Sequence, residues 1–150
     1  MKLLDLAMLI AAVEEARPLA VVAEAVPAEA PWKKTEIRKI DNLKLQRGAS
    51  RYIYSSGRRG TLYEAVIITD SPSFKIILNV DGIPMLDASW NEINSITQEL
   101  VDVTAFQRMT GDYALRIANV SWIKSSHLLL VATDAITINK AIAKYEEVAP

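Results

Sequence analysis

The chain has 150 residues, of which 51% are hydrophobic, and its formal net charge is −1. This length fits one ordinary domain, which can bury a core without a disulfide or metal to hold it together. Because the chain contains no cysteine, disulfide scaffolds, thiolate metal sites and cysteine nucleophiles are excluded.

The first predicted element is a helix over residues 3–16, whose apolar side chains recur at helical spacing. Pro18 ends it, and the Pro/Ala/Glu-rich stretch 27–32 indicates an extended linker. We therefore expect residues 1–32 to form an arm and residues 33–150 to form the main domain. The helix either docks on a neighbouring subunit or packs on its own domain. The residues expected at an oligomer interface are Leu3, Leu6, Ile10 and Val13.

From residue 35 onward the pattern becomes β. TEIRKI and LKLQ read as short alternating pieces, and ASRYIYS places Tyr52 and Tyr54 on one face. SSGRRG (55–60) is predicted to be a hairpin turn, with Gly57 and Gly60 supplying positive φ angles. It lacks the G-K-[ST] ending of a phosphate-binding loop.

The stretch TDSPSFKIILNVDG (69–82) follows the β-branched run 60–70. Its strict alternation predicts a half-buried strand, and TDSPS predicts a hairpin between two adjacent strands. Asp70 and Asp81 lie at opposite ends of this extended segment, roughly 35 Å apart, which is too far for paired acid–base chemistry. We interpret both as turn formers. A calcium site built from Asp81 and Asp87 stays open, although EF-hand spacing is absent.

A helical insertion is expected after Ser89, because Ser89 and Glu92 match the S-x-x-E capping box. Strands are then predicted at 112–123 and 127–133. The last segment, 135–148, fits either a helix or a strand. We favour a strand with a bulge near Asn139, because the apolar phase shifts there. The order as a whole predicts a mainly β protein, an antiparallel β-sandwich of jelly-roll-like or immunoglobulin-like type.

The sequence contains few residues in patterns suited to catalysis. The only histidine, His127, precedes an apolar run, where packing is the more common role. A zinc site or Ser-His-Asp triad lacks convincing residues, so no enzyme activity, catalytic residue, metal or cofactor is expected. The longest uncharged run of the N-terminal segment, residues 6–13, is too short to span a membrane.

Charge is unevenly distributed along the chain. Residues 33–59 contain nine basic side chains against Glu36 and Asp41, a local +7, while the remainder sums to −8. Such a block protects a strand edge, meets an acidic neighbouring subunit, or binds nucleic acid, and we favour the first two. The residues expected to make electrostatic contacts are Lys33, Lys34, Arg38, Arg47, Arg58 and Arg59.

The order RRGTLYEAVIITDSPSFKIILNVDG, a helical SWNEI insertion, HLLLVAT and AITINKAIAKYEEV resembles β-sandwich structural proteins of tailed phages and archaeal viruses. The resemblance covers about residues 58–147 and rests on turn and core residues. It implies a non-enzymatic component of a virion, in a capsid, tail or baseplate. The implied partners are other copies of the chain and other particle proteins.

Two other functions are compatible with the sequence. The alternative is a ligand-binding β-sandwich, such as a carbohydrate-binding module or adhesin, with Trp32, Trp90 and Trp122 as a sugar-stacking platform. The third hypothesis is nucleic-acid binding by the basic block 33–59.

Overall fold

The computed structural model describes residues 33–148, and all statements on structure below concern that part of the chain. It contains nine strands, one α-helix and one 3₁₀ turn. The elements are β3 (Lys33–Leu45), β4 (Ser50–Ser56), β5 (Gly60–Thr69), β6 (Phe74–Val80), β7 (Ile83–Ser89), α2 (Trp90–Ile96), η3 (Thr97–Glu99), β8 (Val103–Gln107), β9 (Tyr113–Trp122), β10 (Ser126–Ala132) and β11 (Ile136–Val148).

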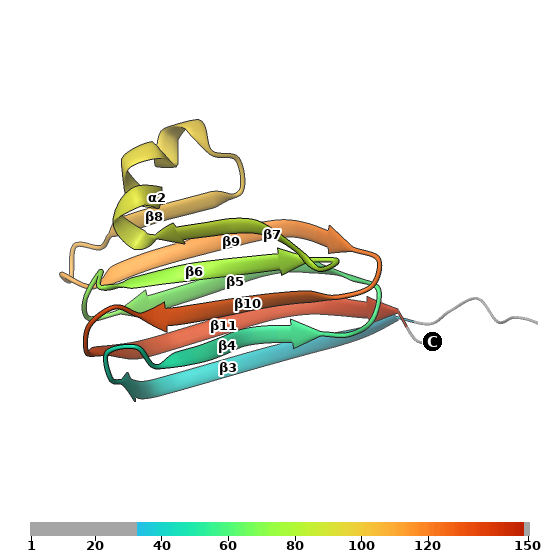
Figure 1. Ribbon diagram of the computed structural model, residues 1–150, viewed down its shortest axis with the longest axis horizontal. Coiled ribbons are helices and arrows are strands. Elements are labelled where there is room, and N and C mark those ends of the chain that lie inside the picture. Colours follow the sequence, from blue (N-terminus) through green and yellow to red (C-terminus); the bar gives the residue numbers. More distant parts are fainter. Residues whose placement is uncertain (1–32, 149–150) are drawn as a thin grey trace, which may run out of the picture. The chain divides into compact units, whose positions relative to one another are not determined.

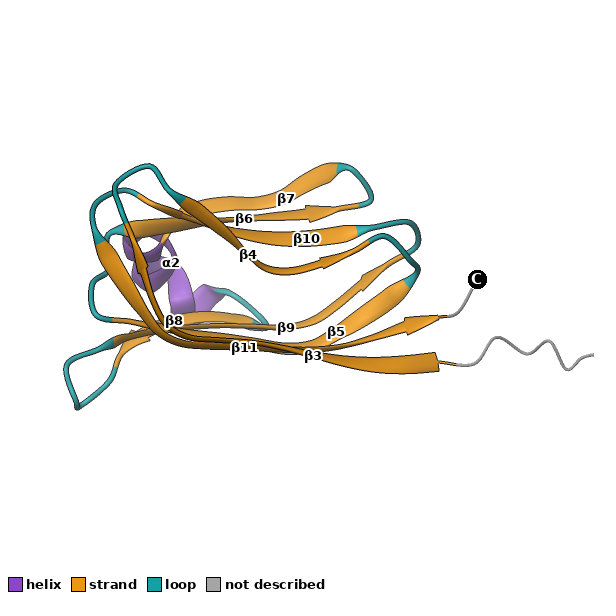
Figure 2. Cartoon of the chain, turned by 90° about the horizontal axis from the view of Figure 1, so that it is seen from below, coloured by secondary structure: helices purple, strands orange, loops and turns teal. Residues whose placement is uncertain are grey.

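The strands form two antiparallel sheets, which confirms the predicted mainly β, antiparallel sandwich. One sheet has four strands in the order β4-β10-β6-β7, and the other has five in the order β3-β11-β5-β9-β8. Figure 2 shows the two sheets as facing layers, with α2 at one end between them. The short helix is the predicted insertion, whereas the predicted helix 3–16 lies outside the described residues.

Strand pairing in the described chain is nested. The first strand, β3, pairs with the last, β11, and β4 pairs with β10 (Figure 1). Further in, β5 pairs with β9, and β6 pairs with β7 through a tight turn. The strand β8 is added at the free edge of β9. The chain therefore runs as one long hairpin whose successive pairs alternate between the two sheets.

The core lies between the sheets, because each strand turns alternate side chains inward. On β6, Phe74, Ile76 and Leu78 are buried, as the alternation predicted. An aromatic cluster fills one end of the core: the ring of Tyr54 stacks 5.8 Å from Trp122 and lies 5.3 Å from Tyr145. Such ring pairs stabilise beyond the apolar area that they bury.

Two predicted hairpins are wrong. The turns 57–59 and 70–73 each join strands of different sheets, since β4 and β6 belong to one sheet and β5 to the other. A turn sequence reverses the chain but does not determine whether the next strand pairs with the previous one. Gly57 and Gly60 also do not have positive φ angles. Gly60 is required for a different reason: a Cβ there would lie 2.8 Å from Trp122 Cζ2.

The prediction that Tyr52 and Tyr54 share a face is wrong as well. Tyr54 is buried while Tyr52 is 54% exposed. The register between β4 and β10 shifts, with Leu128 opposite Tyr54 and Leu129 opposite Tyr52, so Ile53 is an extra residue. A β-bulge of this kind moves neighbouring side chains to opposite faces.

The ambiguous segment at the C-terminal end is a strand, β11, and it carries the predicted bulge at Asn139. Its register against β5 shifts between Ile138 and Lys140. On the other side, Asn42 interrupts β3 with a φ of 49°. The pieces TEIRKI and LKLQ are consequently one irregular strand rather than two.

The helix α2 has the predicted cap. The Ser89 hydroxyl accepts a hydrogen bond from the Glu92 N–H, and the Glu92 carboxylate accepts one from the Ser89 N–H. Trp90, at the first position of α2, donates its indole N–H to the Ala114 carbonyl on β9 at 2.9 Å. This contact joins the helix to the five-stranded sheet.

The flanking strands β7 and β8 were not predicted, because Pro84 and the short length of β8 weaken their patterns.

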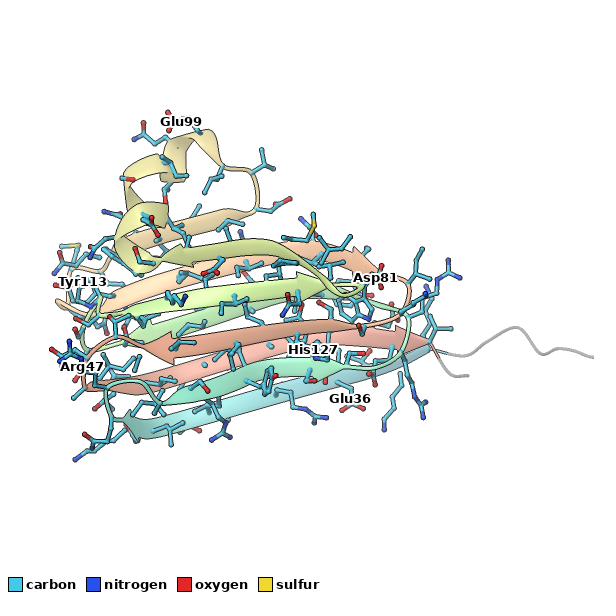
Figure 3. The ribbon with its side chains drawn as sticks, in the orientation of Figure 1. Glu36, Arg47, Asp81, Glu99, Tyr113 and His127 are labelled. Carbon is cyan, nitrogen blue, oxygen red and sulfur yellow. The ribbon has the colours of Figure 1, made fainter. Side chains whose placement is uncertain are left out.

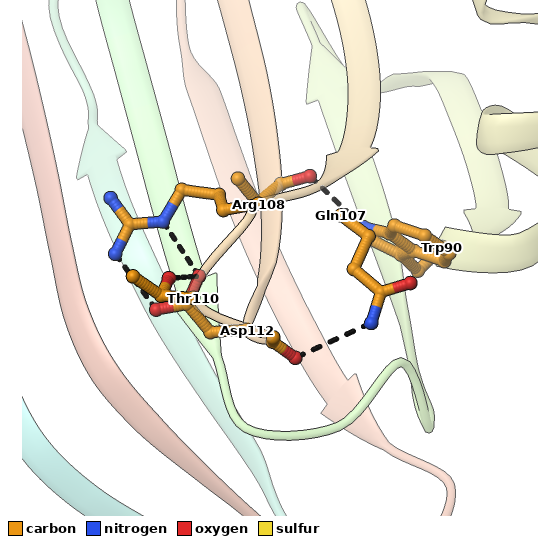
Figure 4. Close-up of polar contacts among 7 residues, drawn as sticks. Trp90, Gln107, Arg108, Thr110 and Asp112 are labelled. Carbon is orange, nitrogen blue, oxygen red and sulfur yellow. Dashed lines mark hydrogen bonds and ion pairs between the residues drawn. The ribbon is translucent and has the colours of Figure 1, made fainter.

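The hairpin between β8 and β9 is fastened by Arg108, whose Nε and Nη2 donate to Asp112 at 2.6 and 2.7 Å (Figure 4). The pKa of the Asp112 carboxyl is lowered mainly by this hydrogen bond.

Candidate interaction surface

A groove of about 560 Å³ opens on the outer face of the five-stranded sheet, away from the core. Three adjacent strands, β11, β5 and β9, contribute its side chains. We call it the sheet groove. It is lined by Tyr63, Glu64, Val66, Ile68, Arg116, Lys140, Ile142 and Lys144.

Strand register places these side chains in rows across the sheet. Ile142 pairs with Val66, which in turn pairs with Arg116. In the next rows Lys140 pairs with Ile68 and Lys144 with Glu64. Paired residues project on the same face. The centre of the groove is therefore aliphatic, and basic side chains surround it.

Ion pairs fix most of these cations. Arg116 donates through Nε to Glu64, and Lys140 Nζ lies 3.1 Å from Asp41 on β3. Lys144 differs, because its ammonium lies 6.0 Å from the centre of the Tyr63 ring, within range of a cation–π contact.

Tyr63 itself is held by a hydrogen bond across the sheet. Its hydroxyl donates to Glu146 at 2.5 Å, and this bond raises the pKa of Tyr63. The strand β5 carries an irregularity here, because its register against β11 shifts between Lys144 and Tyr145. The bulge and the hydrogen bond together hold the ring at the end of the groove.

The six basic residues expected to make electrostatic contacts fall into two places. Lys33, Lys34 and Arg38 lie at the start of β3. Arg58 and Arg59 lie close by in the turn after β4, because the Arg59 carbonyl accepts a hydrogen bond from Val148, the partner of Lys33. Arg47 follows the far end of β3, so it lies apart from the other five (Figure 3).

Carboxylates neutralise part of the basic group at the start of β3. Glu36 lies 3.0 Å from Lys34 and 3.3 Å from Arg38. The hydrogen bond with Lys34 lowers the pKa of Glu36. Lys33 lies 3.9 Å from Glu146. The block 33–59 occupies one edge strand of each sheet, β3 and β4, which matches the arrangement expected of charged edge protection.

The single histidine lies on the outer face of the other sheet. His127 Nδ1 is 2.6 Å from Ser55 Oγ, and its ring lies 6.0 Å from the exposed Tyr52 ring. Hydrogen bonds among residues 33–148 bring no carboxylate to His127 as the third member of a triad.

The two aspartates of residues 69–82 act separately. Asp70 accepts a 2.8 Å hydrogen bond from Thr137 N, a long-range contact rather than a bond within the turn 70–73. Asp81 forms the turn between β6 and β7 with Gly82, both at positive φ, as predicted for a D-G hairpin. Asp87 pairs with Lys75 at 3.3 Å. Within residues 33–148 there is no group of three side chains suited to hold a metal ion.

The predicted sugar-stacking platform is wrong for two of its three residues. Trp90 and Trp122 are both buried, with 4% and 2% of their surface exposed. Their rings pack in the core because each indole N–H finds a backbone carbonyl there, at Ala114 and Arg58 respectively. Trp32 lies outside the described residues.

No known protein-family model matches the chain, and no curated protein matches it in sequence. None of the helices in the part of the chain that the structure describes is long and apolar enough to cross a membrane.

The sheet groove was not predicted, although one signal was present: β5 carries β-branched residues on both of its faces, Val66 and Ile68 as well as Ile67.

Proposed function

We propose that the protein is a non-enzymatic structural component of a virus particle, and that it self-assembles through its N-terminal helix and the surfaces of its sandwich. The observation that supports this proposal is the nested pairing of strands between two sheets. Nested pairs of this kind are expected of a jelly roll, the architecture of many viral capsid domains. Its support is an analogy at the level of the fold, strengthened by the surfaces that the sandwich exposes.

Several apolar side chains on these surfaces are available for contacts. Ile83 and Met85 on the edge strand β7 are 60% and 63% exposed, and Ile123 beyond the end of β9 is 69% exposed. Exposed apolar patches mark interaction sites in soluble proteins. The charged side chains on the edge strands β3 and β4 disfavour unspecific strand pairing between copies at those edges.

Light scattering coupled to size-exclusion chromatography tests the proposal. We expect the mass of the purified chain to rise with concentration toward a defined oligomer, and electron microscopy of that fraction to show particles of uniform size. A monomeric mass at every concentration up to the solubility limit would overturn the proposal.

The carbohydrate-binding alternative is tested by the same preparation. Trp90 and Trp122 are buried in the core and cannot stack on a sugar, so we expect no glycan binding that depends on either residue.

A further inference from the structure

The sheet groove leaves an aliphatic strip open on the outer face of the five-stranded sheet. Ile142 in its centre is 37% exposed, and Ile37, beside Lys144 on β3, is 60% exposed. Val66 and Ile68 continue the strip on β5 and are half-buried. A strip of this kind, on a face with no further layer of residues 33–148 over it, is suited to receive the apolar side of a partner.

The border of the strip is cationic on balance. Seven charged side chains flank it, four of them basic and three acidic, so the border carries a net charge of +1. A partner that complements the groove must present an apolar stripe flanked by carboxylates. The flanking residues are Lys39, Asp41, Glu64, Arg116, Lys140, Lys144 and Glu146.

We propose that the sheet groove binds residues 3–16 of a second copy of this chain. That segment carries the predicted helical stripe from Leu3 to Val13, and its charged residues are Asp5, Glu14 and Glu15, with no lysine or arginine among them. On a helix Asp5 and Glu14 flank this stripe, whereas Glu15 lies on the opposite side, so the stripe and its two flanking carboxylates are the features that the groove requires. The inference rests on the self-association proposed above.

The dimensions of the two surfaces agree. A 14-residue helix is about 21 Å long and about 10 Å wide. From Lys140 to Lys144 the groove runs about 14 Å along β11, and three strands give it a width of about 10 Å. The groove therefore accommodates between two and three turns of the helix, the part that bears the apolar stripe.

A labelled peptide of residues 1–17 tests the contact in solution. The receptor is the full chain with Leu6→Glu and Ile10→Glu, so that its own N-terminal segment does not compete. We expect the peptide to raise its fluorescence anisotropy on binding. Lys144→Glu in the receptor is expected to weaken binding about tenfold, because it reverses a charge at the groove border.

A second groove variant and two controls guard against misfolding and unspecific attraction. Ile142→Ser removes apolar contact without changing charge and is also expected to weaken binding. Arg51→Glu reverses an exposed charge on the other sheet and is expected to leave binding within about twofold. Equal binding of a scrambled peptide, or binding unchanged by both groove variants, would overturn the inference.

Light scattering separates this inference from the proposed function. If the wild-type chain associates and Leu6→Glu/Ile10→Glu or Lys144→Glu abolishes association, both stand. If the wild-type chain, Leu6→Glu/Ile10→Glu and Lys144→Glu all associate equally, the proposed self-assembly stands and the inference about the groove is overturned. If the wild-type chain is a monomer although the peptide binds, the segment does not join copies, and both are overturned.

Discussion

The carboxylate of Asp81 accepts a 2.6 Å hydrogen bond from the backbone N–H of Lys124, and this bond ties the turn between β6 and β7 to the loop between β9 and β10. The neighbouring N–H groups of Ile123 and Ser125 donate to the same carboxylate at 3.1 Å. In return, Asp81 N donates to the Ser125 carbonyl at 2.8 Å. One short side chain thereby fastens a turn within the four-stranded sheet to the loop that connects the two sheets.

Replacement of Asp81 is expected to destabilise the fold in a pH-dependent way. The hydrogen bond from Lys124 and then that from Ile123 lower the pKa of Asp81 below its ordinary value of 3.8. A lowered folded-state pKa stabilises the protein above the unfolded value, and that contribution is lost as the pH falls through the folded one. Asp81→Asn should therefore lower Tm at pH 7, and its difference from wild type should shrink below pH 4. Asp87→Asn, on an exposed neighbour, is the control. Equal Tm values of Asp81→Asn and wild type at pH 7 would contradict the prediction.

Gly60→Ala is expected to destabilise the protein by about 1–3 kcal/mol, the usual cost of overpacking. The added Cβ would meet the Trp122 ring and the Glu146 carbonyl, neither of which can move without shifting β9 or β11. Gly57→Ala is the matched control, three residues away, where an added methyl group would meet no atom within 4 Å and φ is not positive. Urea unfolding should show the loss at Gly60 alone, and similar midpoints for the two variants would refute the close approach.

Ser89→Ala is expected to cost about 0.5–2 kcal/mol, the range measured for lost helix caps. The substitution removes the acceptor for the Glu92 N–H. Ser95→Ala is the comparison within the same helix, since its hydroxyl only donates to the Glu92 carbonyl at an exposed position. Chemical denaturation of both variants checks the prediction. An unfolding midpoint of Ser89→Ala equal to that of the wild type would show that the cap does not stabilise α2.

Alkaline pH is expected to reveal the buried hydroxyl of Tyr54. Burial raises its pKa to about 12, although the hydrogen bond with Ser126 acts in the opposite direction. The unfolded chain releases this proton near pH 10, so Tyr54 stabilises the fold below pH 10, and its contribution is lost as the pH rises to 12. Two pKa units correspond to roughly 2–3 kcal/mol.

Tyr54→Phe isolates that contribution from those of Tyr63 and Tyr145, whose raised pKa values give a slope of the same sign. The unfolding free energy of the variant, measured between pH 9 and 11.5, should fall less steeply than that of the wild type. Parallel slopes would mean that Tyr54 ionises normally in the folded protein.

Local patterns predicted the local structure well. The alternation of Phe74, Ile76 and Leu78 gave the inward face of β6, and Ser89 with Glu92 gave the start of α2. The phase shift at Asn139 gave the bulge in β11. Each of these features depends on residues that are neighbours in sequence, so the sequence alone contains the information.

Pairing between distant segments could not be read in the same way. The turn residues before β5 and β6 were compatible with hairpins, but both turns cross between the sheets, because β11 and β10 take the neighbouring positions. The sheet groove arises from that same pairing: Val66, Arg116 and Ile142 meet only because β5 lies between β9 and β11.

The nested pairing of strands has a consequence for how the protein acquires its structure. The strand that leaves the ribosome first among the described residues, β3, has its sheet partner in the strand that leaves last, β11. Contacts so distant in sequence make folding slow, since the loop-closure entropy must be lost before they form. During synthesis only pairs of consecutive strands, β6 with β7 and β8 with β9, can close early, and the edge of β3 stays open until β11 has been made. The lysines and arginines along β3 thus also guard the nascent chain against premature strand pairing.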